Sequence, residues 1–128
     1  MFRPELSSKP VWKFFKDICA IPHTSGNEAA VSQYLTGFAR ERKLEVLTDG
    51  QMNVLIRKPG QGETVALQAH MDMVGEKISG SSHDFSKDPI SSEIEDGSLI
   101  SRETTLGADN GIGVALMLEL LDGSYPGL

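Results

Sequence analysis

Two amphipathic helices are predicted near the start of the chain by the spacing of its apolar residues. Apolar side chains recur at helical intervals from Val11 to Cys19, with Pro10 suited to a first helical position and Pro22 preventing continuation. A second set with the same periodicity predicts the buried face of another helix. It consists of Val31, Tyr34, Leu35 and Phe38.

The second helix is preceded by a capping signal. Ser25 and Glu28 have the capping-box spacing. We therefore expect the Ser25 hydroxyl to accept a backbone N–H three residues on, while the Glu28 side chain reaches back to the start of the helix.

Short apolar runs between turn residues predict strands in the rest of the chain. Residues 44–47 and 53–57 are two candidates separated by an Asp-Gly pair. Residues 93–95 and 98–100 predict a hairpin, because the Asp-Gly dipeptide between them is typical of a two-residue turn. Helices and strands thus alternate, which favours an α/β fold.

The apolar run at residues 65–69 predicts a buried strand that delivers the chain to His70. A long connection, residues 73–89, follows it, and such loops in compact domains are usually functional or covering segments.

A last helix is predicted at residues 112–121, and it is apolar on nearly every face except at Glu119. A helix of this kind belongs inside a larger protein. We therefore expect the chain to be part of a longer protein, interrupted at a loop within a domain. It contains no internal repeat or low-complexity segment.

The candidate chemistry lies at two points, after the apolar run and before the last helix. His70 and Asp72 are separated by one residue at the carboxyl end of the predicted strand, so both side chains can project into one crevice. Open α/β sheets place their sites at this edge. Histidine is the commonest protein metal ligand, and a carboxylate can fix its tautomer. Asp109, in a glycine-bracketed segment that opens the last helix, is the natural third member.

Each of these residues also has a purely structural interpretation. A histidine after a strand is often simply hydrogen-bonded. Asp109 has the position of a helix N-cap, which aspartate favours. His23, before the second helix, and His83, in the long loop, are weaker candidates that either face solvent or touch substrate.

Composition and charge narrow the class of partner. The 128 residues are 39% hydrophobic and 23% charged, as in an ordinary globular domain. A formal net charge of −6 argues against a nucleic-acid groove or an anionic membrane surface, so a small-molecule partner is favoured. The single cysteine, Cys19, lies in an apolar helical phase and predicts a buried core thiol. No signal peptide or membrane-spanning stretch is evident, so we expect a cytoplasmic protein.

Three segments in this order resemble the aminoacyl-histidine dipeptidases, bacterial co-catalytic zinc peptidases related to aminopeptidases, carboxypeptidases and acylases. They are residues 67–74, residues 83–90 and residues 104–113. The resemblance covers essentially the whole chain, including residues 21–23. One departure is Glu103, where the family usually has glycine, so the conformation of that loop is an open question.

The resemblance implies a site and a fold. It implies that His70 binds one metal, that Asp109 bridges two zinc ions (with cobalt or manganese as possible substitutes), and that Asp72 counts among the catalytic residues by orienting His70. It also implies a cis peptide bond after Asp109. The implied fold is the N-terminal part of an α/β/α catalytic domain with a mixed sheet flanked by helices, spanning residues 1–128.

The resemblance implies that the whole protein is a homodimeric metallodipeptidase that removes an aminoacyl group from a C-terminal histidine. Relatives carry further along a Glu-Glu pair for the general base and a ligand, another acidic ligand, a final histidine ligand and an inserted lid and dimerisation domain. This chain alone is therefore expected to be inactive. The alternatives are a related exopeptidase or amidohydrolase of different specificity and a non-catalytic binding homologue, which a downstream Glu-Glu pair would distinguish.

Overall fold

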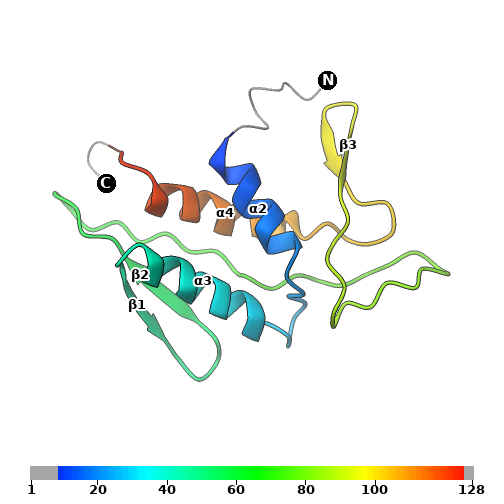
Figure 1. Ribbon diagram of the computed structural model, residues 1–128, viewed down its shortest axis with the longest axis horizontal. Helices are drawn as coiled ribbons and strands as arrows, with labels where there is room; N and C mark the ends of the chain where they lie inside the picture. Colours follow the sequence, from blue (N-terminus) through cyan, green and yellow to red (C-terminus); the bar gives the residue numbers. More distant parts are fainter. Residues whose placement is uncertain (1–8, 126–128) are drawn as a thin grey trace.

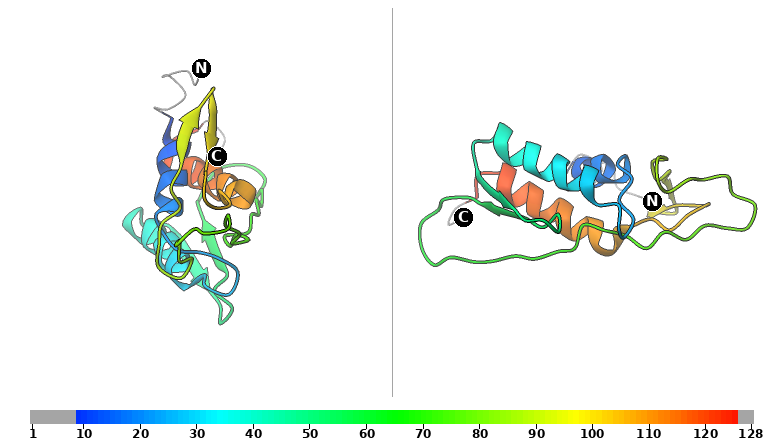
Figure 2. Two further views of the ribbon diagram at one scale, coloured as in Figure 1. Left: turned by 90° about the vertical axis from the view of Figure 1, so that its right-hand side faces the viewer. Right: turned by 90° about the horizontal axis from the view of Figure 1, so that it is seen from below.

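The computed structural model describes residues 9–125, which form three helices and two small hairpins. In Figure 1, α2 and α4 lie against each other, and a long extended segment runs beneath α4. Figure 2 shows the helices on one side and this extended chain on the other. The elements are α2 (Pro10–Cys19), α3 (Ala29–Glu41), β1 (Glu45–Thr48), β2 (Val54–Arg57), β3 (Glu93–Glu95), β4 (Ser98–Ile100) and α4 (Ala108–Asp122).

The core lies between α2 and α4, with α3 contributing from one side. Val31, Leu35 and Phe38 are buried as predicted, whereas Tyr34 is only partly buried. Phe14 and Ala39 are buried as well, and α4 adds Val114, Ala115 and Leu118. The helices approach closely at Gly111, where an added Cβ would lie 3.0 Å from the Phe15 ring. A glycine there allows the start of α4 to pack directly on α2.

Glu119, the acidic residue within the apolar run of α4, makes a hydrogen bond that stabilises α2. The Glu119 carboxylate accepts a hydrogen bond from the backbone N–H of Val11, at 3.1 Å. The first N–H groups of a helix have no partner within it, and an anion there also favours the helix dipole. Glu119 therefore caps α2 from another helix, while the N-cap residue Lys9 makes no side-chain cap.

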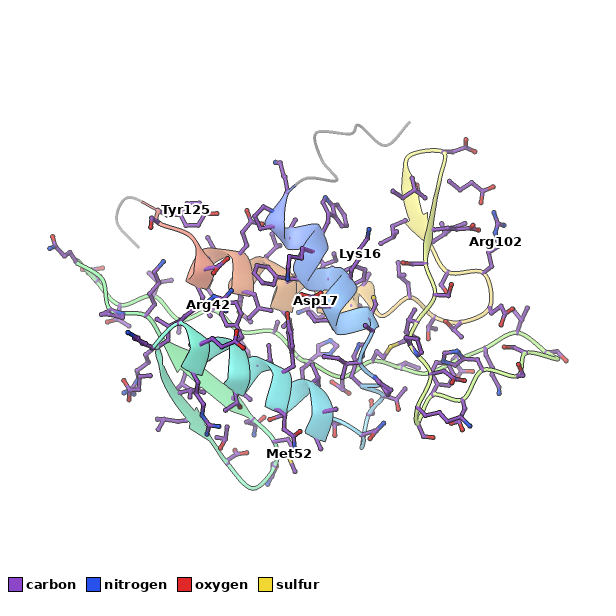
Figure 3. The ribbon with its side chains drawn as sticks, viewed as in Figure 1. Lys16, Asp17, Arg42, Met52, Arg102 and Tyr125 are labelled. Atoms are coloured by element: carbon purple, nitrogen blue, oxygen red, sulfur yellow. The ribbon has the colours of Figure 1, made fainter. Side chains whose placement is uncertain are left out.

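The C-terminal end of α4 is tied to the rest of the fold by two cations. Lys58 Nζ donates to the backbone carbonyls of Leu120 and Gly123. Arg42, visible near the end of α4 in Figure 3, pairs with Asp122 at 2.5 Å and lies over the Phe38 ring. Cations near the last carbonyls of a helix stabilise it.

All four predicted strands of these two regions form, and they make two antiparallel pairs, of which the second was predicted as a hairpin. β1 pairs with β2, within one residue of the predicted bounds, and β3 pairs with β4. Asp96 and Gly97 have φ angles of 48° and 79°, as a two-residue hairpin turn with left-handed central residues requires. The α/β class is thus confirmed, although the described strands form two separate antiparallel pairs and not the expected mixed sheet.

The buried strand expected at residues 65–69 is wrong for this structure. The segment is extended but has no strand partner among the described residues, and Val65 and Leu67 are 70% and 59% exposed. An apolar run predicts a strand through its side chains, but the strand forms only when neighbours satisfy its backbone groups. Here the segment instead lies against α4, with Leu67 and Gln68 beside Leu116 and Leu120.

The expected capping box does not form either. Helix α3 begins at Ala29 without a side-chain cap. The Glu28 carboxylate accepts the N–H of Gly26, and the Ser25 hydroxyl donates to the carboxylate of Asp72. The sequence spacing correctly identified two residues that form hydrogen bonds near the start of the helix. The Ser25 hydroxyl, however, bonds to Asp72, which is distant in sequence, and not to the helix backbone.

Among residues 9–125, the structure contains no helix long and apolar enough to cross a membrane.

Replacing Leu118 by alanine is expected to destabilise the fold by about 2–5 kcal/mol, because this side chain is only 2% exposed and its loss leaves a cavity. Leu116 lies two residues away on the same helix but is 49% exposed, and its replacement is expected to cost less than about 1 kcal/mol. Urea unfolding of both variants measures the difference. Equal losses would contradict the packing of α4 on α2.

Cys19 is buried as expected, and burial raises the pKa of its thiol to about 11. We expect slow labelling by a thiol reagent at neutral pH and rapid labelling in denaturant.

The raised pKa of Cys19 also predicts how stability depends on pH. Because the unfolded thiol loses its proton first, from about pH 9, the free energy of unfolding should fall as pH rises towards about 11. The Cys19→Ala variant should lack this part of the decline. If the variant and the wild type show the same dependence of unfolding free energy on pH, the decline does not come from the Cys19 thiol.

Candidate metal centre

The structure brings together the three side chains that the sequence singled out. His70 Nδ1 lies 3.1 Å from Asp72 Oδ1 and 3.0 Å from the Asp72 backbone oxygen. His70 Nε2 lies 3.0 Å from Asp109 Oδ1. The two ring nitrogens of His70 thus face different carboxylates, from residues far apart in the chain.

This arrangement assigns different tasks to the two carboxylates. A proton on Nδ1 is held by two oxygens of Asp72, which favours the tautomer with a free lone pair on Nε2. When Nε2 also carries a proton it donates to Asp109 Oδ1 at 3.0 Å, and a metal ion between the two atoms would take the place of that proton. A neutral His70 is therefore oriented as a metal ligand, with Asp72 as the orienting group.

Asp109 reaches the site through the local backbone at the start of α4. The peptide bond between Asp109 and Asn110 is cis, as the resemblance implied, and both residues have non-helical φ and ψ angles. The helix-capping task falls to Asn110, whose Oδ1 accepts the N–H of Gly113 at 3.1 Å. The interpretation of Asp109 as a mere N-cap is therefore wrong, and its carboxylate, 96% exposed, stays available to a ligand.

Gly107 allows the turn that leads into Asp109. Its φ of 77° lies in the left-handed region that glycine adopts without strain. An added Cβ would also meet Met73 Sδ at 2.9 Å and His23 Nε2 at 3.5 Å. Both backbone conformation and space therefore require glycine at this position.

The electrostatics of the cluster follow from its hydrogen bonds. The bond to the Asp109 carboxylate, supported by Asp72, raises the pKa of His70. The hydroxyl of Ser25 and, to a smaller degree, His70 lower the pKa of Asp72. Asp72 is therefore an anion at neutral pH, as an orienting group for a histidine ligand must be.

The pair formed by His70 and Asp109 fits part of a zinc site. Two ligand atoms at about 2.0–2.1 Å from one tetrahedral ion are roughly 3.3 Å apart, close to the observed 3.0 Å between Nε2 and Oδ1. A catalytic zinc commonly has about three protein ligands. In the described part of the chain, no three His, Cys, Asp or Glu side chains form a group that could hold a metal, so this pair supplies only part of a ligand set.

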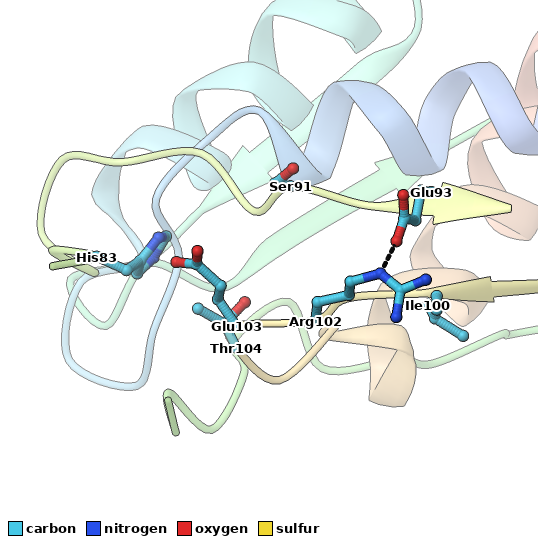
Figure 4. Close-up of a pocket in the computed structure, with 7 residues that line it drawn as sticks. All are labelled: His83, Ser91, Glu93, Ile100, Arg102, Glu103 and Thr104. Atoms are coloured by element: carbon cyan, nitrogen blue, oxygen red, sulfur yellow. Dashed lines mark hydrogen bonds and ion pairs between the residues drawn. The ribbon is translucent and has the colours of Figure 1, made fainter. Parts of the chain in front are cut away.

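His23 and His83 lie outside this cluster. His23 is only 2% exposed, so it does not face solvent, and its Nδ1 lies 2.5 Å from the Ile21 oxygen. His83 packs edge-on against Phe85 and lines a hollow of about 320 Å³ with Glu103 and Arg102 (Figure 4). Arg102 is paired with Glu93 there. This hollow shares no lining residue with the His70 cluster.

Glu103, which stands where the resembled family usually has glycine, has a backbone conformation that any residue can adopt. Its φ is not positive, so the loop does not require glycine. Its carboxylate accepts the Ser81 hydroxyl at 2.9 Å and its backbone oxygen accepts the N–H of Ile78. The residue thus ties two parts of the loop region together.

Sequence reasoning missed one residue of this cluster. Ser25 Oγ donates to Asp72 Oδ2 at 2.6 Å, although the two residues are far apart in the chain. The capping-box pattern accounted for Ser25 locally, and nothing in the spacing pointed to a distant acceptor. The alignment of residues 23–25 beside residue 73 could have been found only from the folded chain.

The sequence and the fold of this chain are similar to those of dipeptidases. The chain is 45% identical to the cytosol non-specific dipeptidase of Escherichia coli strain K12 over 91% of its length. Its structure matches the crystal structure of the aminoacylhistidine dipeptidase from Vibrio alginolyticus with a TM-score of 0.86 and 42% identity, over 94% of the chain. No family model matches the chain.

The likeness covers only part of each relative. The chain spans 25% of the Escherichia coli dipeptidase and 26% of the Vibrio alginolyticus one. The shared α/β fold is therefore that of a part of a dipeptidase.

Proposed function

We propose that this chain carries part of the zinc centre of a metallodipeptidase, a hydrolase that cleaves dipeptides. The observation that supports the proposal is the convergence of His70 Nε2 and Asp109 Oδ1 at 3.0 Å, in a chain 45% identical to a dipeptidase. Together they favour a peptidase over a binding protein without metal.

In this proposal each residue has a defined task. His70 would bind one zinc ion through Nε2, and Asp109, whose side chain is 96% exposed, would bridge two. Asp72 holds the proton on Nδ1 and keeps the imidazole ring in orientation. Zinc, when bound, polarises a peptide carbonyl and lowers the pKa of a bound water. Cobalt or manganese could substitute for it.

We propose that the rest of the catalytic site lies in other sequence. The other ligands, the general base and a dimer-forming domain would come from further sequence of a longer protein, and the described residues would be the N-terminal portion of its catalytic domain. Support comes from the quarter share of each relative that the chain spans and from a donor set too small for two ions.

We propose further that the substrates are dipeptides with a C-terminal histidine and that the protein is a cytoplasmic homodimer. The names of the two relatives differ here, since one is called non-specific and the other aminoacylhistidine dipeptidase. Hydrolysis of a dipeptide is therefore better supported than a preference for histidine. The net charge of −6 gives no support to a nucleic-acid partner.

A chimera tests this function. The matching segment of the Escherichia coli dipeptidase is replaced by residues 9–125 of this chain, and the purified protein is assayed on Ala-His and on dipeptides without histidine. Chelator-sensitive hydrolysis within about tenfold of the parent enzyme is expected, because the two segments are 45% identical over 91% of this chain.

The second candidate, a non-catalytic binding homologue, needs a different test, because the rest of the chimera comes from the Escherichia coli enzyme. A Glu-Glu pair downstream of this chain in its own longer protein would favour the enzyme, and its loss would favour the binding homologue. The preference of that longer protein between Ala-His and other dipeptides decides between the histidine-specific enzyme and a related exopeptidase.

A further inference from the structure

Asp72 is held from both sides by different partners. Its Oδ1 faces His70 Nδ1 at 3.1 Å, and its Oδ2 accepts the Ser25 hydroxyl at 2.6 Å. The final torsion of an aspartate side chain is broad, so one contact alone does not fix the plane of the carboxylate. The Ser25 hydroxyl supplies the second contact that fixes it.

The backbone around Ser25 is already fixed by other bonds. Its N–H donates to the Met73 oxygen at 3.1 Å, and the Met73 N–H donates to the His23 oxygen at 3.0 Å. Thr24 and Met73 form a parallel bridge. The hydroxyl is thus presented to Asp72 from an anchored backbone, so little conformational entropy is lost when it donates.

We propose that Ser25 is a positioning residue of the metal centre, which acts through Asp72 to aim His70 Nε2 at the zinc shared with Asp109. The part of this inference that concerns zinc rests on the proposed function. The part that concerns the orientation of His70 does not, because it follows from contacts within the chain.

A purely structural task for the Ser25 hydroxyl predicts something different. If the bond merely joined residues 23–25 to residues 72–73, its loss would leave His70 unchanged, since the two backbone bonds already join these segments. If the bond orients Asp72, its loss frees the carboxylate to rotate, and the His70 ring loses its fixed partner. The state of the His70 ring therefore discriminates between the two tasks.

The experiment compares three variants of this chain with the wild type. Ser25→Ala removes the hydroxyl, and Ser25→Thr keeps one. Ser86→Ala is the matched control, because Ser86 Oγ also donates to an aspartate, Asp84 Oδ1, at 2.6 Å in an exposed position. Urea unfolding of all four proteins shows whether any change in the site is a change in stability.

The first measurement is NMR of the zinc-free chain labelled with ¹⁵N-histidine, which has three histidines to assign. Exchange of the His70 Nδ1 proton with water is expected to be about threefold to tenfold faster in Ser25→Ala, since an exposed charge-assisted bond contributes modestly. It should be close to the wild-type rate in Ser25→Thr and Ser86→Ala. Equal exchange rates in all four proteins would overturn the proposal.

The second measurement is zinc binding by the chimera carrying each variant, in competition with a chromogenic chelator, because this chain alone supplies only part of a ligand set. Ser25→Ala is expected to weaken binding by about tenfold, as the loss of an outer partner of a histidine ligand typically does. If the unmodified chimera shows no zinc binding while Ser25→Ala still accelerates proton exchange at His70 in the chain, the proposed metal centre fails and the orienting task of Ser25 stands. If zinc binds equally to Ser25→Ala and Ser86→Ala, Ser25 does not act on the metal centre.

Discussion

Replacing His70 by alanine in the active chimera is expected to reduce dipeptide hydrolysis to the level of the chelator-treated protein. The imidazole Nε2 is the nitrogen that faces Asp109, so the variant loses the proposed zinc ligand and leaves Asp109 without its neighbour. Zinc content, measured by atomic absorption on the dialysed protein, should fall with activity.

Replacing Asp72 by asparagine is expected to separate binding from turnover. The side chain keeps its size and one oxygen, but it no longer carries the negative charge that holds the Nδ1 proton of His70. Substantial zinc should remain while activity falls about 10- to 100-fold.

The matched control for His70 is His83→Ala, which removes another imidazole from a hollow that shares no residue with the cluster. Its zinc content should equal that of the unmodified chimera. Normal zinc content and normal turnover in His70→Ala would refute the assignment of His70 as a ligand.

The helices of this fold could be predicted from sequence because their signals are local. The apolar spacing in α2 fixes its buried face, and Pro10 and Pro22 bracket it without reference to the rest of the chain. The Asp-Gly turn between β3 and β4 is equally local, since both residues adopt the positive φ angles that the turn needs.

The extended segment at residues 65–69 could not be predicted in the same way. Its apolar residues indicate a strand, but strand pairing is a contact with distant chain, and in the described structure no strand lies beside it. The same limit applies to Glu119. Its polar position in an apolar helix was evident, whereas its task as a cap of α2 depends on the crossing of the two helices.

The candidate site was partly predictable for a related reason. His70 and Asp72 are close in sequence, and Asp109 stands out by its glycine neighbours, so their types and positions suggested a cluster. The division of tasks at the start of α4 was not visible. Either Asp109 or Asn110 could cap the helix by residue type, and only the backbone angles at this point give the capping task to Asn110.

The exposed apolar surface of the chain also has a consequence for experiments on it. Val65, Leu67 and Leu116 are all at least 49% exposed, and residues 65–69 have no strand partner in the part of the chain that the structure describes. Unpaired extended chain and exposed apolar side chains favour association. Assays should therefore be run at low protein concentration, with the oligomeric state checked by light scattering.

The 128-residue chain by itself is expected to hydrolyse Ala-His far more slowly than the Escherichia coli dipeptidase does, even with excess zinc. Among residues 9–125, the carboxylates in contact with His70 are Asp72 and Asp109. In the proposed site the first would orient the ring and the second would bind the ion, so neither is left to act as the general base. General acid–base catalysis contributes about 10²- to 10⁴-fold. Too few ligands to hold two ions add to the deficit.

The measurement is a side-by-side assay of the chain, the parent dipeptidase and the chimera at equal molar concentration, each with and without chelator. The chimera serves as the positive control, because it contains the same residues within a full set of partners. Chelator-sensitive turnover by the isolated chain near the rate of the chimera would show that His70, Asp72 and Asp109 suffice for catalysis. The proposal that the site is completed by other sequence would then be wrong.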